Sequence, residues 1–104
     1  MNHILIDRLT VPANAKEEFI ERMNINRAII HQQPGFIRDE IFEPVDTNGD
    51  LIYFTTAVWE NETALQMARE KVQAAYQQEG FDLAAFCRER GIKIERGIYH
   101  KLND

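Results

Sequence analysis

Cysteine is nearly absent from this sequence, with Cys87 alone among 104 residues. A single thiol excludes an intramolecular disulfide and a cysteine-rich zinc site, and it is typical of a reducing compartment such as the cytoplasm. His3, His31 and His100 lack the His-x-x-x-His spacing of a metal site, so we expect no bound metal. Glycine is also scarce, and the absence of Gly-x-Gly-x-x-Gly and Walker loops argues against nucleotide and flavin cofactors.

Basic side chains are outnumbered by acidic ones, 12 against 17, which gives a net charge of −5. That sign opposes binding to a phosphate backbone, so we expect no nucleic-acid partner. Long apolar runs are missing too, because no stretch approaches the roughly 20 residues needed to span a bilayer. Residues 1–12 lack the basic start and apolar stretch of a secretory signal. We therefore expect a cytoplasmic protein with no membrane association.

The chain is long enough for one modest hydrophobic core. Its 44% apolar content over 104 residues suits a single domain spanning residues 1–104. A core of this size lies near the small end of what folds alone, and packing against a second copy would add stability. We therefore expect a homodimer.

The first predicted strand, residues 3–11, carries apolar side chains on both faces. One face holds Leu5, Asp7, Leu9 and Val11, and the other holds Ile4, Ile6, Arg8 and Thr10. A strand of this kind is typical of a sheet covered by helices on one side and by another sheet on the other.

A helix is predicted to follow, from about Ala15 to Gln32, capped by Asn14 with Glu17 as its capping-box partner. Its inner stripe is Phe19, Met23, Arg27 and Ile30, whereas Arg22 belongs to the solvent side.

Two more strands are predicted at residues 36–43 and 51–59, joined by a hairpin connection in which Asn48-Gly49 accepts positive φ. The first is polar enough for a position near an edge, and the second is apolar enough to be central. A helix at 61–78 should be capped by Asn61 and stopped by Gly80. A shorter helix at 82–90 should be stopped by Gly91. The last strand, residues 92–102, is predicted to carry a bulge at Gly97.

The resulting order, βαββααβ, predicts a ferredoxin-like α+β fold with a four-stranded antiparallel sheet and helices on one face. The other sheet face then needs a partner.

Several segments resemble the antibiotic biosynthesis monooxygenase superfamily over nearly the whole chain. They are Asp7-Arg8-Leu9-Thr10-Val11, Glu18-Phe19, Gln33-Pro34-Gly35-Phe36 and Thr55-Thr56-Ala57-Val58-Trp59-Glu60-Asn61. The resemblance implies a homodimeric α+β barrel with a ligand cleft between the sheet and the helices of each subunit. Some members are cofactor-free oxygenases that act on phenols, quinols or polyketide-like aromatics, and one branch binds and cleaves haem.

Asp7 and Tyr76 are the candidate catalytic residues. Asp7 lies between Leu5 and Leu9 on a strand face that helices should cover, where a carboxylate needs a polar partner. It could be a general base that removes a phenolic proton, or one half of a structural ion pair with a neighbouring Arg or Lys. Tyr76 lies on the inner stripe of its helix, and its hydroxyl needs a partner if it is buried.

In the haem-degrading branch the places of Asp7, Tyr76 and Ala68 hold an asparagine, the axial histidine and a tryptophan. The standard haem-cleaving site is therefore not expected. Tyrosinate can ligate ferric haem, so haem stays the alternative to having no cofactor.

The function we expect is a cofactor-independent monooxygenase acting on a small electron-rich aromatic. The resemblance favours an enzyme, and the alternative is a non-enzymatic dimer that binds a hydrophobic ligand, with haem as one candidate. Aromatic residues and methionines that could contact the ligand, or alternatively fill the core, are Trp59, Phe54, Met23, Met67, Tyr99 and Phe86.

Overall fold

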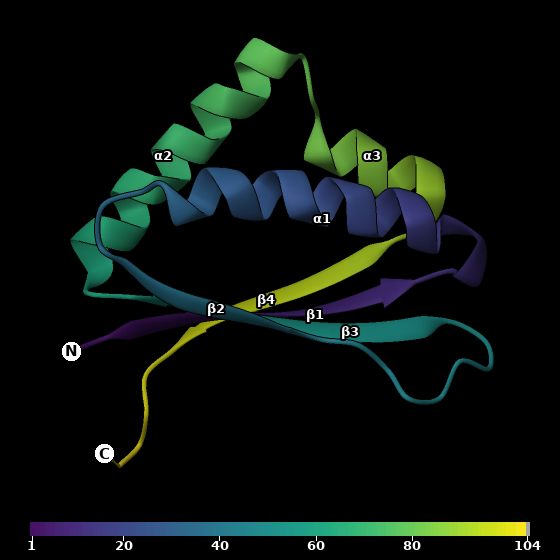
Figure 1. Cartoon of the computed structure of the whole chain (residues 1–104), viewed down its shortest axis with the longest axis horizontal. Helices are drawn as coiled ribbons and strands as arrows, with labels where there is room; N and C mark the ends of the chain where they lie inside the picture. The colour runs from purple at the N-terminus through teal and green to yellow at the C-terminus, as the bar shows by residue number, and fades with distance from the viewer. Residues whose placement is uncertain (104) are drawn as a thin grey trace.

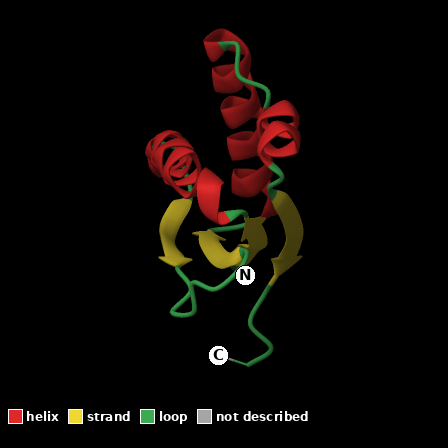
Figure 2. Ribbon diagram, turned by 90° about the vertical axis from the view of Figure 1, so that its right-hand side faces the viewer, coloured by secondary structure: helices red, strands yellow, loops and turns green. Residues whose placement is uncertain are grey.

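The computed structural model describes residues 1–103, which form one four-stranded antiparallel sheet with helices on one face (Figures 1 and 2). The strands are β1 (His3–Val11), β2 (Phe36–Phe42), β3 (Leu51–Trp59) and β4 (Lys93–Tyr99). The helices are the short 3-10 turn η1 (Ala13–Ala15), then α1 (Lys16–His31), α2 (Glu62–Glu79) and α3 (Leu83–Arg90). The strand order β2-β3-β1-β4 confirms the predicted ferredoxin-like α+β fold, with β2 at an edge and β3 in the centre.

The two central strands determine which side chains face the helices. In the β1–β3 pair, Leu5 lies opposite Ala57, and Asp7 lies opposite Thr55. Directly opposed residues point to the same face of an antiparallel sheet, and successive residues alternate between faces. The predicted division of β1 into two faces is therefore confirmed.

The hydrophobic core between the sheet and the helices has two buried clusters. The larger includes Leu9, Val11 and Phe19, and it packs around Tyr53, whose ring centroid lies 4.9 Å from that of Phe19. The smaller consists of Trp59 at the end of β3 and of Leu65 and Ala68 from α2. Full burial of a large apolar side chain contributes about 1.5–3 kcal/mol, so these clusters hold α1 and α2 against the sheet.

The predicted ends of α2 and α3 are confirmed. The Oδ1 atom of Asn61 accepts a hydrogen bond of 2.8 Å from the backbone N–H of Ala64, and Asp82 caps α3 in the same way at 3.1 Å. Gly80 ends α2 with φ of 74°, a left-handed conformation that glycine adopts without steric cost. These caps define where α2 begins and ends and where α3 begins.

Three local predictions are wrong, one of them only in part. Ala15, not Asn14, precedes α1, because η1 occupies the turn after Pro12 and no side chain caps the helix. In the loop between β2 and β3, Gly49 takes a positive φ of 74° whereas Asn48 does not.

The third wrong prediction is the bulge at Gly97, since the β1–β4 register is unbroken there. The register shift lies between Phe36 and Arg38 in β2 instead. The ring of Tyr99 lies over Gly97, in the space that a side chain at this position would fill.

No helix covers the sheet face on the side away from α1, α2 and α3 within residues 1–103 (Figure 2). Phe42, Phe54 and Tyr99 are 50%, 42% and 53% exposed, and their register places them on this face together with Ile4 and Ile6. Within residues 1–103, no helix is long and apolar enough to cross a membrane.

Candidate functional site

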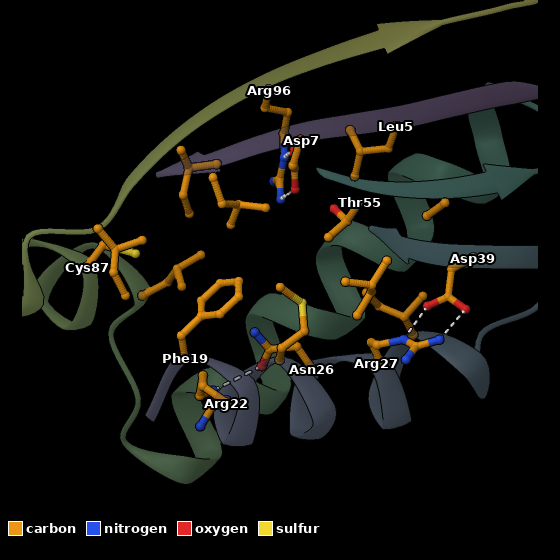
Figure 3. A pocket seen from close by; sticks show the side chains of 18 of the residues that line it. Leu5, Asp7, Phe19, Arg22, Asn26, Arg27, Asp39, Thr55, Cys87 and Arg96 are labelled. Carbon is orange, nitrogen blue, oxygen red and sulfur yellow. Dashed lines mark hydrogen bonds and ion pairs between the residues drawn. The ribbon is translucent and has the colours of Figure 1, made fainter. Parts of the chain in front are cut away.

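A cavity of about 120 Å³ lies between the sheet and the helices (Figure 3). A single buried water needs only about 10–15 Å³, so this space can hold a larger molecule. Most of its wall is apolar and includes Leu5, Leu9, Phe19, Met23, Ile41 and Phe86. The charged side chains at the wall are Asp7, Arg22, Arg27, Asp39 and Arg96.

Asp7 lies at this cavity and is held by Arg96 from the neighbouring strand. The two residues are directly opposed in the β1–β4 pair. The Nε and Nη2 atoms of Arg96 donate hydrogen bonds of 2.8 and 2.9 Å to the two carboxylate oxygens (Figure 3). These hydrogen bonds raise the pKa of the Arg96 guanidinium. Asp7 was expected either to act at a cavity or to form a structural ion pair. It lies at the cavity and is also paired with Arg96.

Tyr76 reaches the same cavity from α2 and is 8% exposed. Its ring meets Phe81 edge-on at 5.1 Å, and the Arg22 guanidinium lies 5.3 Å from its ring centroid. Burial raises the pKa of the Tyr76 hydroxyl, and the nearby Arg22 charge opposes this effect. Tyr76 is therefore protonated at neutral pH and can donate a hydrogen bond into the cavity.

Arg22 is buried, which corrects its placement on the solvent side of α1. Its guanidinium donates to both carboxylate oxygens of Glu79, at 2.8 Å for the Nη2–Oε1 pair, and its Nε donates to Asn26 at 3.0 Å. The same group stacks on Phe81, 3.4 Å from the ring centroid. The guanidinium is weakly hydrated and stacks on aromatic faces, so it tolerates a position that Lys would not. Arg22 thus connects α1 with the end of α2.

Asp39 joins the far end of the cavity to α1. It accepts hydrogen bonds of 2.7 and 3.0 Å from Arg27, and His31 lies 2.9 Å from its Oδ1 atom. The hydrogen bonds from Arg27 lower the pKa of the Asp39 carboxyl, and His31 adds to this effect. Sequence analysis missed Asp39, although the alternation of β2 places it on the same face as Ile41 and could have identified it.

The structure brings some predicted ligand contacts together and separates others. Met23 and Phe86 line the cavity, as does Cys87, whose thiol pKa is raised by burial. Trp59 is buried in the smaller cluster instead, and its indole Nε1 has no hydrogen-bond partner within residues 1–103.

Phe54, Tyr99 and Met67 also lie outside the cavity. Phe54 and Tyr99 alternate onto the opposite sheet face, and Met67 is 55% exposed in a separate hollow beside α2. These three residues therefore do not line this cavity, because strand alternation and helix phase point them elsewhere.

The residues at the cavity do not fit haem. No histidine lines it, and Tyr76 is buried in its protonated form, which is a poor ligand for iron. Residues 1–103 also contain no group of three or more His, Cys, Asp or Glu side chains that could hold a metal ion. We therefore derive no reaction step through either group.

Comparisons with known proteins find a clear relationship. The sequence profile described as antibiotic biosynthesis monooxygenase matches residues 3–78. SnoaB, a cofactor-independent oxygenase from Streptomyces nogalater, is 24% identical with a TM-score of 0.73, over 99% of this chain and 98% of its own.

A second structure, a haem-degrading protein from Mycobacterium tuberculosis, is 22% identical with a TM-score of 0.60, over 100% of this chain and 98% of its own. No curated protein matches the sequence significantly. At these identities the two structures support the fold alone.

Proposed function

The chain belongs to the antibiotic biosynthesis monooxygenase family, and from this membership we propose that it is a cofactor-independent monooxygenase acting on a small electron-rich aromatic. The observation that carries the proposal is the mostly apolar cavity to which Asp7, Tyr76 and Arg96 contribute polar groups. An apolar pocket with a few convergent polar groups is the usual form of a small-molecule site. SnoaB, a cofactor-independent oxygenase, shares this fold.

Asp7 is the group that we propose as the proton acceptor. An ionised carboxylate has about four lone-pair sites, of which Arg96 occupies two. Each oxygen of Asp7 therefore retains capacity to accept a proton or a hydrogen bond from a phenolic hydroxyl. Arg96 fixes the carboxylate, and Tyr76 can donate a hydrogen bond to the oxygen of the ligand.

The reaction balances without an external reductant. The phenol loses its hydroxyl proton to Asp7, and the resulting anion transfers electrons to O₂. One oxygen atom bonds to a ring carbon, the hydrogen on that carbon is lost, and the other oxygen atom leaves as water, so that phenol and O₂ give quinone and water. The substrate supplies all four electrons, and the protein contributes orientation, proton transfer and a dry environment.

A second candidate function is a non-enzymatic dimer that binds a hydrophobic ligand. It is favoured by the bidentate contact between Asp7 and Arg96, which is also the geometry of a purely structural ion pair. Here the cavity would hold an apolar molecule without turnover.

We also propose that the functional unit is a homodimer located in the cytoplasm. The uncovered sheet face with Phe42, Phe54 and Tyr99 supports pairing of two sheets. The single cysteine supports a reducing compartment.

Oxygen consumption separates the two functions. Purified protein is incubated with a set of phenols and hydroquinones while an electrode follows O₂ and absorbance follows the quinone. A monooxygenase consumes one O₂ for each quinone formed from a phenol. Ligands that raise the melting temperature without any O₂ consumption would establish the binder instead.

A further inference from the structure

Asn26 lies inside α1 and lines the cavity between the sheet and the helices. Asparagine is a weak helix former, because its side chain competes with the backbone for hydrogen bonds. Here the side chain pairs with another side chain instead, since its Oδ1 atom accepts a hydrogen bond of 3.0 Å from the Nε atom of Arg22. Residues four positions apart share one face of a helix, so both side chains lie on the cavity side of α1.

This hydrogen bond determines which way the amide of Asn26 points. A guanidinium nitrogen can only donate, so the atom of Asn26 that meets Arg22 must be the oxygen. The nitrogen of the planar amide then points away from Arg22. Figure 3 shows this arrangement, with the oxygen of Asn26 joined to Arg22 and the nitrogen turned toward the cavity.

Arg22 is itself held from two sides. Its two Nη atoms donate to the two carboxylate oxygens of Glu79 at the end of α2. The guanidinium also stacks on Phe81, 3.4 Å from the ring centroid. A planar guanidinium fixed in this way directs its Nε atom to one place. The Arg22–Glu79 pair carries no net charge, so what it imposes on the cavity is the orientation of Asn26.

The nitrogen of the Asn26 amide is free to donate to a ligand. Among the hydrogen bonds of residues 1–103, the side chain of Asn26 takes part only through its oxygen. The residue is half-buried in a mostly apolar wall. A ligand that displaces water from this nitrogen loses affinity unless it offers an acceptor in return. The site therefore discriminates between ligands with and without an acceptor on the side of α1.

We propose that Asn26 is a specificity-determining residue, which donates from its side-chain nitrogen to a neutral acceptor oxygen of the ligand, such as the carbonyl of an aromatic ketone. Arg22 is its positioning residue, because it fixes the orientation of the amide. The inference rests on the proposed function only in that the same cavity receives the ligand. It applies equally to a substrate and to a ligand that is bound without turnover.

The test compares acetophenone with α-methylstyrene, in which a CH₂ group replaces the carbonyl oxygen. The two probes have nearly the same shape, neither ionises, and neither carries a hydroxyl that Asp7 could deprotonate. The preference is the Kd of α-methylstyrene divided by the Kd of acetophenone. Asn26→Asp keeps the shape and the acceptor for Arg22 but removes the donor. We expect it to lower the preference about threefold to tenfold, the effect of one neutral hydrogen bond.

Asn24→Asp is the matched control, because Asn24 is an exposed asparagine of the same helix that does not line the cavity. It should leave the preference unchanged. If Asn26 serves only to hold Arg22, Asn26→Asp should also leave the preference unchanged, and this result overturns the proposal. A preference that survives Asn26→Asp but is abolished by Tyr76→Phe assigns the donor to Tyr76 and likewise overturns it.

Nuclear magnetic resonance of the parent protein decides the question if Asn26→Asp does not fold. The side-chain NH₂ signals of Asn26 should move to lower field with acetophenone and stay in place with α-methylstyrene, and equal shifts with both probes contradict the donor role. In Arg22→Met the shift should weaken although Asn26 is still present, and a full shift in the folded variant rejects the positioning role. Neither probe is a phenol, so these results are independent of oxygen consumption. The monooxygenase and the selection by Asn26 can each fail while the other stands.

Discussion

Asp7 is a carboxylate placed where a carboxylate costs free energy unless it is paired. It is 7% exposed and lies next to an apolar cavity. Removing an ionised group from water is unfavourable by several kcal/mol unless hydrogen bonds and an opposite charge compensate. Arg96 provides both, and the strand register brings the two side chains together. The same pairing leaves oxygen lone pairs of Asp7 open to the cavity.

We predict that Asp7→Asn lowers the rate on a phenol by about 10²–10⁴, the range for loss of positioned proton transfer. Asn keeps the shape of the side chain but cannot accept a proton at neutral pH. Steady-state kinetics with an oxygen electrode measures this loss. An unchanged rate together with a lowered melting temperature would leave Asp7 as a structural residue.

The control is Arg96→Gln, which breaks the ion pair and keeps the carboxylate. If Asp7 is only structural, both variants should lose similar stability and the rate should follow the folded fraction. If Asp7 accepts the proton, Arg96→Gln should retain more activity than Asp7→Asn at equal folded fraction.

Asp39 leads to a pH prediction. Arg27 holds the pKa of the Asp39 carboxyl in the folded chain below its ordinary value. The ionised Asp39 therefore stabilises the folded chain above about pH 4, the ordinary pKa of an aspartate. This stabilisation is lost as the pH falls through the lowered pKa of the folded chain. Asp39→Asn should therefore cost about 1.5–3 kcal/mol at pH 7, the range for hydrogen bonds to charged groups. The cost should shrink as the pH approaches 2. Urea unfolding of both proteins from pH 7 to pH 2 measures the difference, and a cost independent of pH contradicts this assignment.

The ion pairs could not be predicted from the sequence, even where the fold could. The partner of Asp7 depends on the β1–β4 register, and Arg22 was placed in solvent because its helical position alone does not reveal Glu79, 57 residues later. Local periodicity places a side chain on a face, whereas a long-range pair requires the packing of two elements. Asp7, Tyr76 and Met23 were predicted at the cavity because each belongs to an inward stripe.

Among the helices, the start was predictable where an extended residue directly precedes the first turn, with no 3-10 turn before it. Asn61 and Asp82 have extended backbones, so the side-chain oxygen of each reaches the first turn of its helix. Asn14 has the same chemistry, but it lies within η1 and cannot adopt that conformation. A cap therefore depends on the backbone that leads into it.

This contrast predicts the effect of two matched substitutions. Asn61→Ala should lower the free energy of unfolding by about 1 kcal/mol, because the N–H of Ala64 loses its acceptor. The melting temperature should fall by about 4–8 °C for a domain of this size. Asn14→Ala should stay within about 0.5 kcal/mol of the parent protein. Thermal and urea melts measure both, and an equal loss from the two variants would reject the capping assignment.

At the scale of the whole molecule, the sheet divides the chain into a covered half and an open half. The helix-facing side holds the core and the cavity, and its composition could be predicted from strand alternation. The open side carries Phe42, Phe54 and Tyr99, which a monomer would leave in water. Phe42 and Phe54 lie opposite each other in the β2–β3 pair, and exposed apolar side chains that adjoin in this way mark interaction surfaces. A second copy offers an identical face, so two sheets can pack with twofold symmetry.

We predict that Phe54→Glu converts a dimer into a monomer without unfolding the chain. Phe54 lies on a central strand, so in a face-to-face dimer it is close to the middle of the interface. Removal of a carboxylate from water there is costly in both subunits, even with Arg8 on the neighbouring strand. In the isolated chain the position is already 42% exposed and accepts a charge.

Met67→Glu is the control, because Met67 is similarly exposed but lies on α2, on the helical side. Sedimentation at micromolar concentration should give the mass of two chains for the parent protein and for Met67→Glu, and of one chain for Phe54→Glu with its circular dichroism unchanged. A parent protein that sediments as one chain rejects the dimer, and a dimeric Phe54→Glu moves the interface away from this face.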